Sequence, residues 1–568
     1  MPKAIRLRPD PEWIRARREL LGQLKAEVRA RLGAEPADLH RFRLRYEREL
    51  ARKWRLSDKR ELIDEIQKAD IVYGGDFHSL RQAQRTHLKI LRELAPERRV
   101  VLALECFAIS SQKHLERFLE GKLSAADLRK KSRWDTAWGF PWENYRPLLE
   151  LAKARGFGLL ALGDAEPGSE PASLRAREKL AAMRIEEARR RQPGALVYVV
   201  FGDFHLASAH LPSEVRARLE RFGPKNAQGS REVVVHLNSE RIYFELAEQG
   251  LELTTDVVRF RGRAKAASVE FCVLGSPPWV QWQSHLLYLE RADELGPFAG
   301  DHDDFDPTEQ VAKLARLAAR DLGVDKSAKA WLSDLHVYSP DDESVWQAIE
   351  KKLKSRERAV GRSLLLAGRT FYMPGVETGY LSETSINQAA TLAGYVLHAR
   401  LAKRTVSLWG MPKDFPGLIW TEAAAYFISK LVNHKRQAET LTDLRATLAM
   451  SSPSDHGREA MRLALDQAMS ELVLLKGGRR RPPRAKARRK ASYFEAARIL
   501  GGMLGEKLYL AHRSRRLSKR EILQLLEKDV AAPGFRRDYE EILRALSRGL
   551  GSRAEQLAGE AKSRRERL

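Results

Sequence analysis

The tetrapeptide Gly-Asp-Phe-His occurs twice in the chain, at residues 75–78 and 202–205. Imidazole and carboxylate together form a ligand set that suits zinc, manganese or non-haem iron. A turn after a strand needs neither Phe nor His, so two identical copies favour a functional site over turn chemistry alone. The residues that could do this chemistry are Asp76, His78, Asp203 and His205.

Each copy is placed by the elements around it. An apolar, β-branched run precedes each one, at 69–73 and 195–201, and helix-forming sequence follows. Both copies therefore predict a strand, a turn and a helix. Two further strands, expected at 99–104 and 158–162, alternate with helical sequence and predict a mainly parallel sheet. The carboxyl ends of parallel strands meet at the edge that borders the ligand crevice, where we expect both imidazoles.

Two more acidic residues follow predicted strands. Glu105 comes directly after the strand at 99–104, and Asp164 follows the one at 158–162. With Asp76, His78, Asp203 and His205 they would form one polar rim able to hold a divalent metal. Glu105 or Asp164 could alternatively act as general base towards a metal-bound water. The competing interpretation is structural, with each Gly a turn residue, each Asp a helix cap and each His hydrogen bonded in the core.

Residues 134–147 are rich in aromatic side chains. Gly139 and Pro141 exclude one continuous helix, so we expect a loop that enters a helix near Trp142. Such a cluster could form a lid, or a platform for a flat ligand such as a porphyrin, with Tyr145 as an oxygen ligand to iron. The alternative is core packing, because Tyr145 shares a helical face with apolar residues.

The remaining sequence completes the fold prediction. Strands at 233–237 and 242–246 are expected to form an antiparallel hairpin, and sequence beyond residue 290 is almost wholly helical. We predict an α/β N-terminal domain with a mainly parallel sheet, followed by an all-α C-terminal region. The expected ranges are 1–60 for N-terminal helices, 61–250 for the α/β domain, 251–290 for a connector, 291–475 for a helical domain, 476–492 for a basic linker and 493–568 for C-terminal helices.

Composition restricts the partners and the compartment. The net charge of +25 attracts phosphates, anionic lipid or acidic protein. Only two cysteines occur, Cys106 and Cys272, in no spacing that suggests a disulfide framework or a zinc finger. No run approaches the roughly 20 apolar residues of a transmembrane segment, and the basic N-terminus is not followed by a signal core. We therefore expect a cytoplasmic protein.

One segment is strongly basic and carries two prolines. It is a solvated linker first, and second a site for nucleic acid or acidic lipid. Its cationic residues are Arg479, Arg480, Arg481, Arg484, Lys486, Arg488, Arg489 and Lys490.

The motifs, taken in order, resemble the ChaN-like domain of the Tiki/TraB/erythromycin-esterase superfamily. The matching text covers about residues 60 to 246 and consists of 75–78, 104–105, 142–147, Arg177 with Met183, and 202–205. The resemblance implies an α/β fold with a pocket at the two turns. It leaves the reaction open, because ChaN binds haem, Tiki proteins are metal-dependent proteases and erythromycin esterases are hydrolases.

Three functions follow from the resemblance and the residues. The first is binding of haem or a metal ion, with haem held by Tyr145, His78 and His205. The second is a metal-dependent hydrolase, a peptidase or esterase in which Glu105, His78 and His205 are catalytic. The third is a non-catalytic interaction protein that acts through its basic helical half.

Overall fold

The computed structural model describes residues 6–164, 173–223, 229–261, 268–294, 306–324, 332–339, 349–351, 353–405, 414–449, 455–477 and 490–547. The chain divides into two compact units. The first lies within Glu19–Pro297, and the second combines Ile5–Arg18 with Phe298–Arg567. The predicted order of an α/β part followed by a helical part is confirmed. The finer domain boundaries remain predictions.

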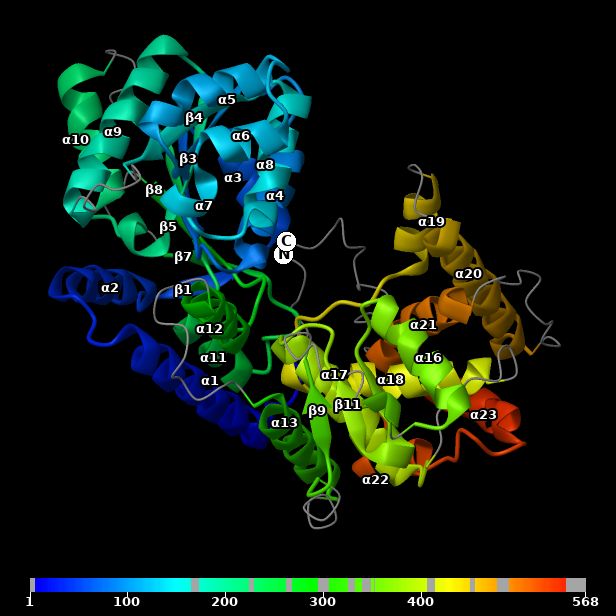
Figure 1. Ribbon diagram of the computed structural model, residues 1–568. Coiled ribbons are helices and arrows are strands. Elements are labelled where there is room, and N and C mark those ends of the chain that lie inside the picture. The colour runs from blue at the N-terminus through cyan, green and yellow to red at the C-terminus, as the bar shows by residue number, and fades with distance from the viewer. Residues whose placement is uncertain are drawn as a thin grey trace. The chain divides into compact units, whose positions relative to one another are not determined.

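The first unit is built on an eight-stranded sheet in the order β1-β7-β8-β6-β2-β5-β3-β4 (Figure 1). Strands β8, β6, β2, β5, β3 and β4 are parallel to their neighbours, whereas β7 is antiparallel to β1 and β8. The mainly parallel sheet predicted from the sequence is therefore confirmed. The strands are β1 Trp54–Ser57, β2 Ile71–Asp76, β3 Val100–Ala108, β4 Gly158–Gly163, β5 Leu196–Gly202, β6 Glu232–Leu237, β7 Val257–Phe260 and β8 Ser268–Val273.

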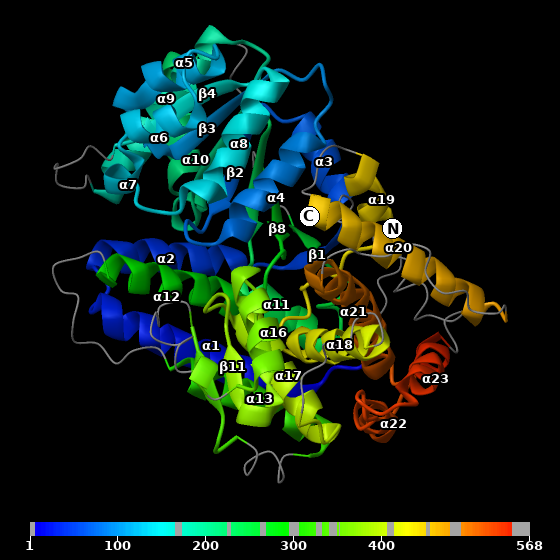
Figure 2. The ribbon, with the colours of Figure 1, turned by 45° about the vertical axis from the view of Figure 1, so that its right-hand side comes forward.

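Helices cover both faces of this sheet, with α9 and α10 on one side and α4 and α8 on the other (Figures 1 and 2). Strands buried on both faces read as continuous apolar runs, which is why β2, β3 and β5 could be found in the sequence. The helices are α3 Lys59–Gln67, α4 Arg81–Arg92, α5 Gln112–Leu119, α6 Ala125–Lys131, α7 Trp134–Ala137, α8 Trp142–Arg155, α9 Leu174–Arg191, α10 Leu211–Phe222 and α11 Glu240–Glu248, with short 3-10 helices η1 Ile109–Ser111 and η2 Asp203–Leu206.

The predicted hairpin at 233–246 is wrong. Its first strand exists as β6, but β6 pairs in parallel with β8, and the second predicted strand is the helix α11. The hydroxyl of Ser239 accepts a hydrogen bond from the backbone N–H of Ile242 and caps that helix. The stretch at 251–290 supplies β7 and β8 to the sheet, and α12 (Pro278–Glu294) begins within it.

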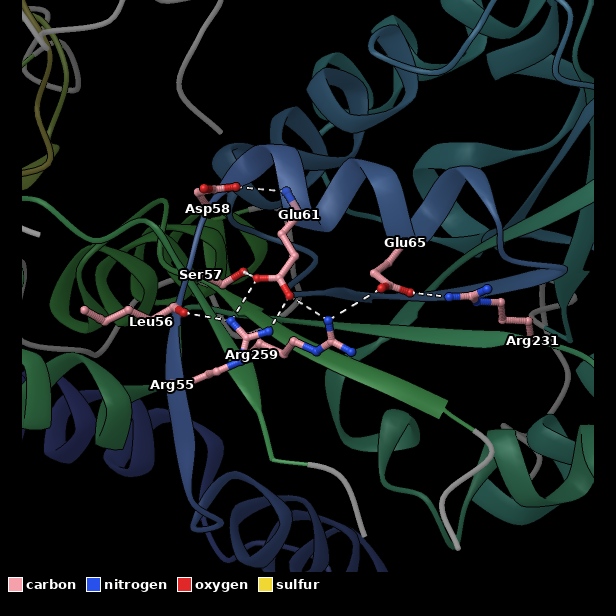
Figure 3. Close-up of polar contacts among 8 residues, drawn as sticks. All are labelled: Arg55, Leu56, Ser57, Asp58, Glu61, Glu65, Arg231 and Arg259. Carbon is pink, nitrogen blue, oxygen red and sulfur yellow. Dashed lines mark hydrogen bonds and ion pairs between the residues drawn. The ribbon is translucent and has the colours of Figure 1, made fainter. Parts of the chain in front are cut away.

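Strand β1 is tied to α3 by a network of charged side chains (Figure 3). Glu61 accepts hydrogen bonds from Nη1 of Arg55 (2.9 Å), Nη1 of Arg259 (2.6 Å) and the hydroxyl of Ser57 (2.7 Å). The hydrogen bonds from Arg55 are the main reason that the pKa of Glu61 falls to about 2. The network joins the edge strand β1 and its neighbour β7 to a helix.

Two N-terminal helices precede the sheet, α1 (Pro11–Leu32) and α2 (Ala37–Leu50). The break between them falls at residues 33–36, as the glycine and proline there predict. Helix α1 runs through the residue at which the chain passes from the second unit to the first.

The second unit is mainly helical and also holds a three-stranded sheet in the order β10-β11-β9. Helix α18 packs between α17 and α21, where Gly394 and Gly505 allow close approach because a Cβ at either would collide with the backbone of α18. Its described elements are α13 Pro307–Leu322, β9 His336–Tyr338, α16 Ser355–Leu366, β10 Phe371–Met373, η4 Pro374–Val376, β11 Thr378–Tyr380, α17 Ile386–Leu401, α18 Phe415–Val432, α19 Leu441–Ala449, α20 Asp455–Leu475, α21 Lys490–Arg513, α22 Lys519–Leu526 and α23 Phe535–Ser547.

Two further predictions concern the basic segment and membrane-spanning helices. The basic segment lies outside the described residues except for Lys490, the first residue of α21. Among the helices described, none combines the length and apolar character needed to cross a bilayer.

Candidate functional site

The two Gly-Asp-Phe-His turns meet at the carboxyl edge of the sheet. Strands β2 and β5 are neighbours, and Asp76 lies opposite Gly202 in their register. A Cβ placed on Gly202 would lie 3.4 Å from Oε2 of Glu105 and 3.6 Å from both Cε1 of His78 and Cδ2 of His205. The two ring carbons are therefore at most twice that distance apart. Three of the predicted site residues surround one backbone position that carries no side chain.

The first imidazole is held by a buried carboxylate. Nδ1 of His78 lies 3.1 Å from Oδ2 of Asp76, which is 4% exposed. Asp76 also accepts hydrogen bonds from the hydroxyl of Tyr145 (2.6 Å) and from Nε2 of Gln84 (2.5 Å). Burial raises the pKa of Asp76, but the hydrogen bonds from His78 and Tyr145 outweigh burial and leave the pKa below its usual value. Asp76 is thus a carboxylate fixed on three sides.

His78 lies in an aromatic setting. Its ring centroid is 4.6 Å from that of Trp138 and 5.0 Å from that of Phe140. Burial lowers the pKa of His78, yet the hydrogen bond and charge of Asp76 raise it further, so the net shift is upward. Nε2 makes no hydrogen bond to the described part of the chain. The imidazole therefore has one nitrogen fixed and the other available to a ligand.

The second imidazole repeats this arrangement with a different acid. Nδ1 of His205 is 2.8 Å from Oε1 of Glu178, a residue of α9 that is 2% exposed. His210 approaches the same oxygen at 3.4 Å. Phe42 of α2 stacks on the ring of His210 and meets the ring of His205 edge-on. Within the described residues, Nε2 of His205 likewise has no hydrogen-bond partner.

Glu105 lies between the two imidazoles. Its Oε2 accepts a hydrogen bond of 2.6 Å from the backbone N–H of Gly202, and the side chain is buried. This bond fixes the carboxylate at the point where the two turns meet. Glu105 is therefore placed to act as a ligand or as a base.

The other acidic candidates lie differently. Oδ1 of Asp203 packs against Gly75, where there is no room for a side chain, and it is buried without a hydrogen bond. Burial, together with the charge of Asp76, raises the pKa of Asp203 to about 8. Asp164 forms an ion pair of 3.4 Å with Arg177. A neutral acid and a carboxylate paired with Arg are both weak metal ligands.

The described ranges contain no group of three or more His, Cys, Asp or Glu side chains arranged to hold a metal ion. Around Gly202 the carboxylates are instead hydrogen bonded to imidazole, amide and phenol groups.

Tyr145, predicted as an oxygen ligand to iron, is buried with its hydroxyl directed at Asp76. Burial and the charge of Asp76 raise its pKa well above the usual value, which opposes the phenolate that would bind iron. The rings of Trp134 and Trp142 are buried and pack edge-to-face. The aromatic segment therefore serves mainly as core, and Trp138 and Phe140 are the members that lie beside His78.

Sequence reasoning missed two sets of residues. Glu178 is one, although an acidic residue on the same face of α9 as Ala181, Ala182 and Ile185 is a recognisable signal. The other set is on α12. Tyr288 stacks on Phe140 with ring centroids 4.2 Å apart, and the ring centroid of His285 lies 5.8 Å from that of Phe77. Burial lowers the pKa of His285 to about 4, so this ring is neutral. Helix α12 thus closes the side of the site that holds His78.

Comparison with known families supports the resemblance. Residues 62–166 match the family described as haem-binding uptake, Tiki superfamily, ChaN. The matched segment runs from α3 past β4 and contains Asp76, His78, Glu105 and Tyr145, while His205 and Glu178 lie beyond it. No curated protein and no solved structure matched the chain.

Proposed function

Taking the family match over residues 62–166 as the premise, we propose that the first unit binds haem at the rim formed by the two turns. His78 and His205 are the ligating residues. The observation that carries this proposal is that each imidazole is held at Nδ1 by a buried carboxylate while Nε2 stays available. Ligating histidines characteristically donate their other nitrogen to an acid in this way.

The chemistry of the residues fits haem. Imidazole is a common axial ligand of haem iron, and bound iron would supply redox or ligand-exchange chemistry. The rings of Trp138 and Phe140 beside His78 give an apolar wall for a flat macrocycle. Tyr145 is a positioning residue in this proposal, because it acts on His78 through Asp76.

A metal-dependent hydrolase is the second candidate. It is favoured by Glu105, whose carboxylate shares the position beside Gly202 with both imidazoles. His78, His205 and a carboxylate would then hold a divalent metal or position a water, and Glu105 would be the base. Asp76 would orient His78. Asp203 and Asp164 contribute less, since one is neutral near pH 7 and the other is paired with Arg177.

The third function, an interaction with nucleic acid or acidic lipid, rests on the charge of residues 479–490 alone. It concerns a different part of the chain and assigns no catalysis to the first unit.

The sharpest test places a methyl group at the centre of the site. Gly202→Ala is tolerated by its backbone (φ −52°, ψ 134°) and its Cβ would make contacts of 3.4 to 3.6 Å. We expect it to lower haemin affinity at least tenfold, measured by titration of the Soret band, with a stability loss under about 1 kcal/mol. Gly158→Ala, at the start of β4, is the matched control and should bind normally.

Substitution of the ligands separates the two candidates. Under the haem proposal His78→Ala and His205→Ala shift the Soret band, and Glu105→Gln does not. Under the hydrolase proposal elemental analysis finds stoichiometric metal that falls in all three variants. Unchanged haemin binding by Gly202→Ala would reject this rim as the haem site.

A further inference from the structure

The mainly helical second unit contains a buried cation without an acidic partner. Arg404 is 9% exposed, and its nearest hydrogen bond joins Nη1 to the hydroxyl of Thr421 at a long 3.4 Å. Its Nε is buried and unbonded, and in the described part of the chain no carboxylate lies within ion-pair distance. A buried charge in this state costs several kcal/mol unless something compensates it.

The turn that follows α17 places Arg404 inside. Lys403 adopts a left-handed conformation (φ 50°), and the N–H of Arg404 returns to the carbonyl oxygen of Ala399 at 2.8 Å. This closure folds the chain back against the helix end. A left-handed conformation is costly for lysine, and here it is adopted directly before the buried Arg404.

A second unsatisfied group, His398, packs on the same stretch of α18: its ring centroid lies 6.5 Å from that of Trp420, the neighbour of Thr421. His398 of α17 is 1% exposed, and both of its ring nitrogens are buried without a hydrogen bond. Burial, and then the charge of Arg404, lowers its pKa to about 3, so the ring is neutral. A neutral imidazole offers one donor and one acceptor, and here neither is used.

The carboxylates bonded to Tyr372 and Tyr395 are already engaged. Glu377 accepts from the hydroxyl of Tyr372 and pairs with Arg400. Glu422 accepts from the hydroxyl of Tyr395 at 2.7 Å and pairs with Arg369. The acidic groups that act on Arg404 electrostatically are the hydroxyls of Tyr372 and Tyr395, which are neutral at pH 7, and exposed Asp529. Exposed Asp529 is therefore the one charged acid among the groups that act on Arg404.

We propose that Arg404 and His398 form a binding site for a phosphate group in the second unit. The guanidinium supplies charge and donors to the phosphate oxygens. Hydrogen phosphate, which both donates and accepts, matches the donor and the acceptor of the neutral imidazole. Arg404 keeps its charge at neutral pH, since burial lowers its pKa only to about 10.

The test uses the full chain and inorganic phosphate, with sodium chloride at equal ionic strength as the reference. We expect phosphate to bind, by calorimetric titration, and to raise the melting temperature. Arg404→Met should weaken phosphate binding at least tenfold, and His398→Gln should weaken it several-fold. Lys403→Met is the matched control, because it removes the same charge from the exposed neighbour.

A stability measurement keeps the test decisive. Without phosphate, Arg404→Met should be as stable as the wild type or more stable, because it removes an uncompensated buried charge. Absence of phosphate binding by the wild type, or equal binding by the wild type and Arg404→Met, would overturn the proposal. If Arg404→Met does not fold, the same comparison is made with His398→Gln. A phosphate affinity equal to that of the wild type would also count against the site.

Discussion

Asp203 is an acid that folding holds in its neutral form. Its pKa of about 8 lies well above the ordinary value of 3.8 because the side chain is buried beside Asp76. Between pH 4 and 8 the unfolded chain has lost this proton and the folded chain keeps it. Stability therefore falls by about 1.4 kcal/mol for each pH unit over this window and levels off above pH 8.

Asp203→Asn should remove this dependence. Urea denaturation at pH 5 and pH 8 should show the variant gaining stability relative to the wild type as the pH rises. Parallel stability profiles for the two proteins would show that Asp203 ionises normally in the folded state.

Glu178 is the residue on which the position of His205 depends. Its negative charge faces His205 at 2.8 Å and His210 at 3.4 Å. Glu178→Gln keeps the shape but weakens the acceptor, so we expect haemin affinity to fall about 10- to 100-fold. Glu186→Gln is the control on the same helix, since Glu186 is also buried but faces Arg190 and Arg218. Equal losses in both variants would mean that the effect is on the stability of α9.

At the scale of elements, strand β1 is held by charge. The folded pKa of Glu61 is about 2 against an ordinary 4.5, so its ion pairs stabilise the fold above pH 4.5 and are lost as the pH falls towards 2. Glu61→Gln should cost about 1 to 3 kcal/mol at pH 7. The difference from the wild type should shrink between pH 4.5 and 2 in urea titrations followed by circular dichroism. A constant difference over that range would exclude the ion pairs as its cause.

Elements were predictable from the sequence where burial is uniform. The predictions found β2, β3 and β5 because each contains a buried apolar run, and the helix at Trp142 follows from Pro141. The run at 242–246 failed because Tyr243, Phe244 and Leu246 read equally well as a strand and as a buried helix face, and Ser239 decides for the helix. The meeting of the two turns followed from parallel topology, whereas contacts from α2 and α12 depend on packing that no local pattern encodes.

The partners of the site residues also depend on packing that no local sequence pattern encodes. His78 and His205 follow strand ends, Glu105 lies within β3, and all three could be proposed from spacing. The acid that holds His205 comes from a helix, Glu178, and the acid that holds His78 is the Asp76 of its own turn. Which carboxylate binds metal, orients an imidazole or stays neutral is set by burial, and the sequence shows burial only in part.

At the scale of the whole molecule, two units with separate cores should unfold in separate steps. Gly74→Ala would force a Cβ to within 2.9 Å of Nδ1 of His87 in the first unit. Gly394→Ala would bring a Cβ to 2.6 Å from Cα of Ala425 in the second. Each overpacked variant should lose about 1 to 3 kcal/mol, so scanning calorimetry should show one transition lowered by several degrees in each case.

Because each transition is assigned to one unit, the two ligand proposals can be tested separately. Haemin should raise the transition that Gly74→Ala lowers, and phosphate the one that Gly394→Ala lowers, each by about 3 kcal/mol at a hundredfold excess over its dissociation constant. Helix α1 is shared along the chain, so it is the element through which the units could unfold together. A single transition that both glycine variants lower equally would show that the two cores unfold together, and the ligands would then stabilise the molecule as a whole.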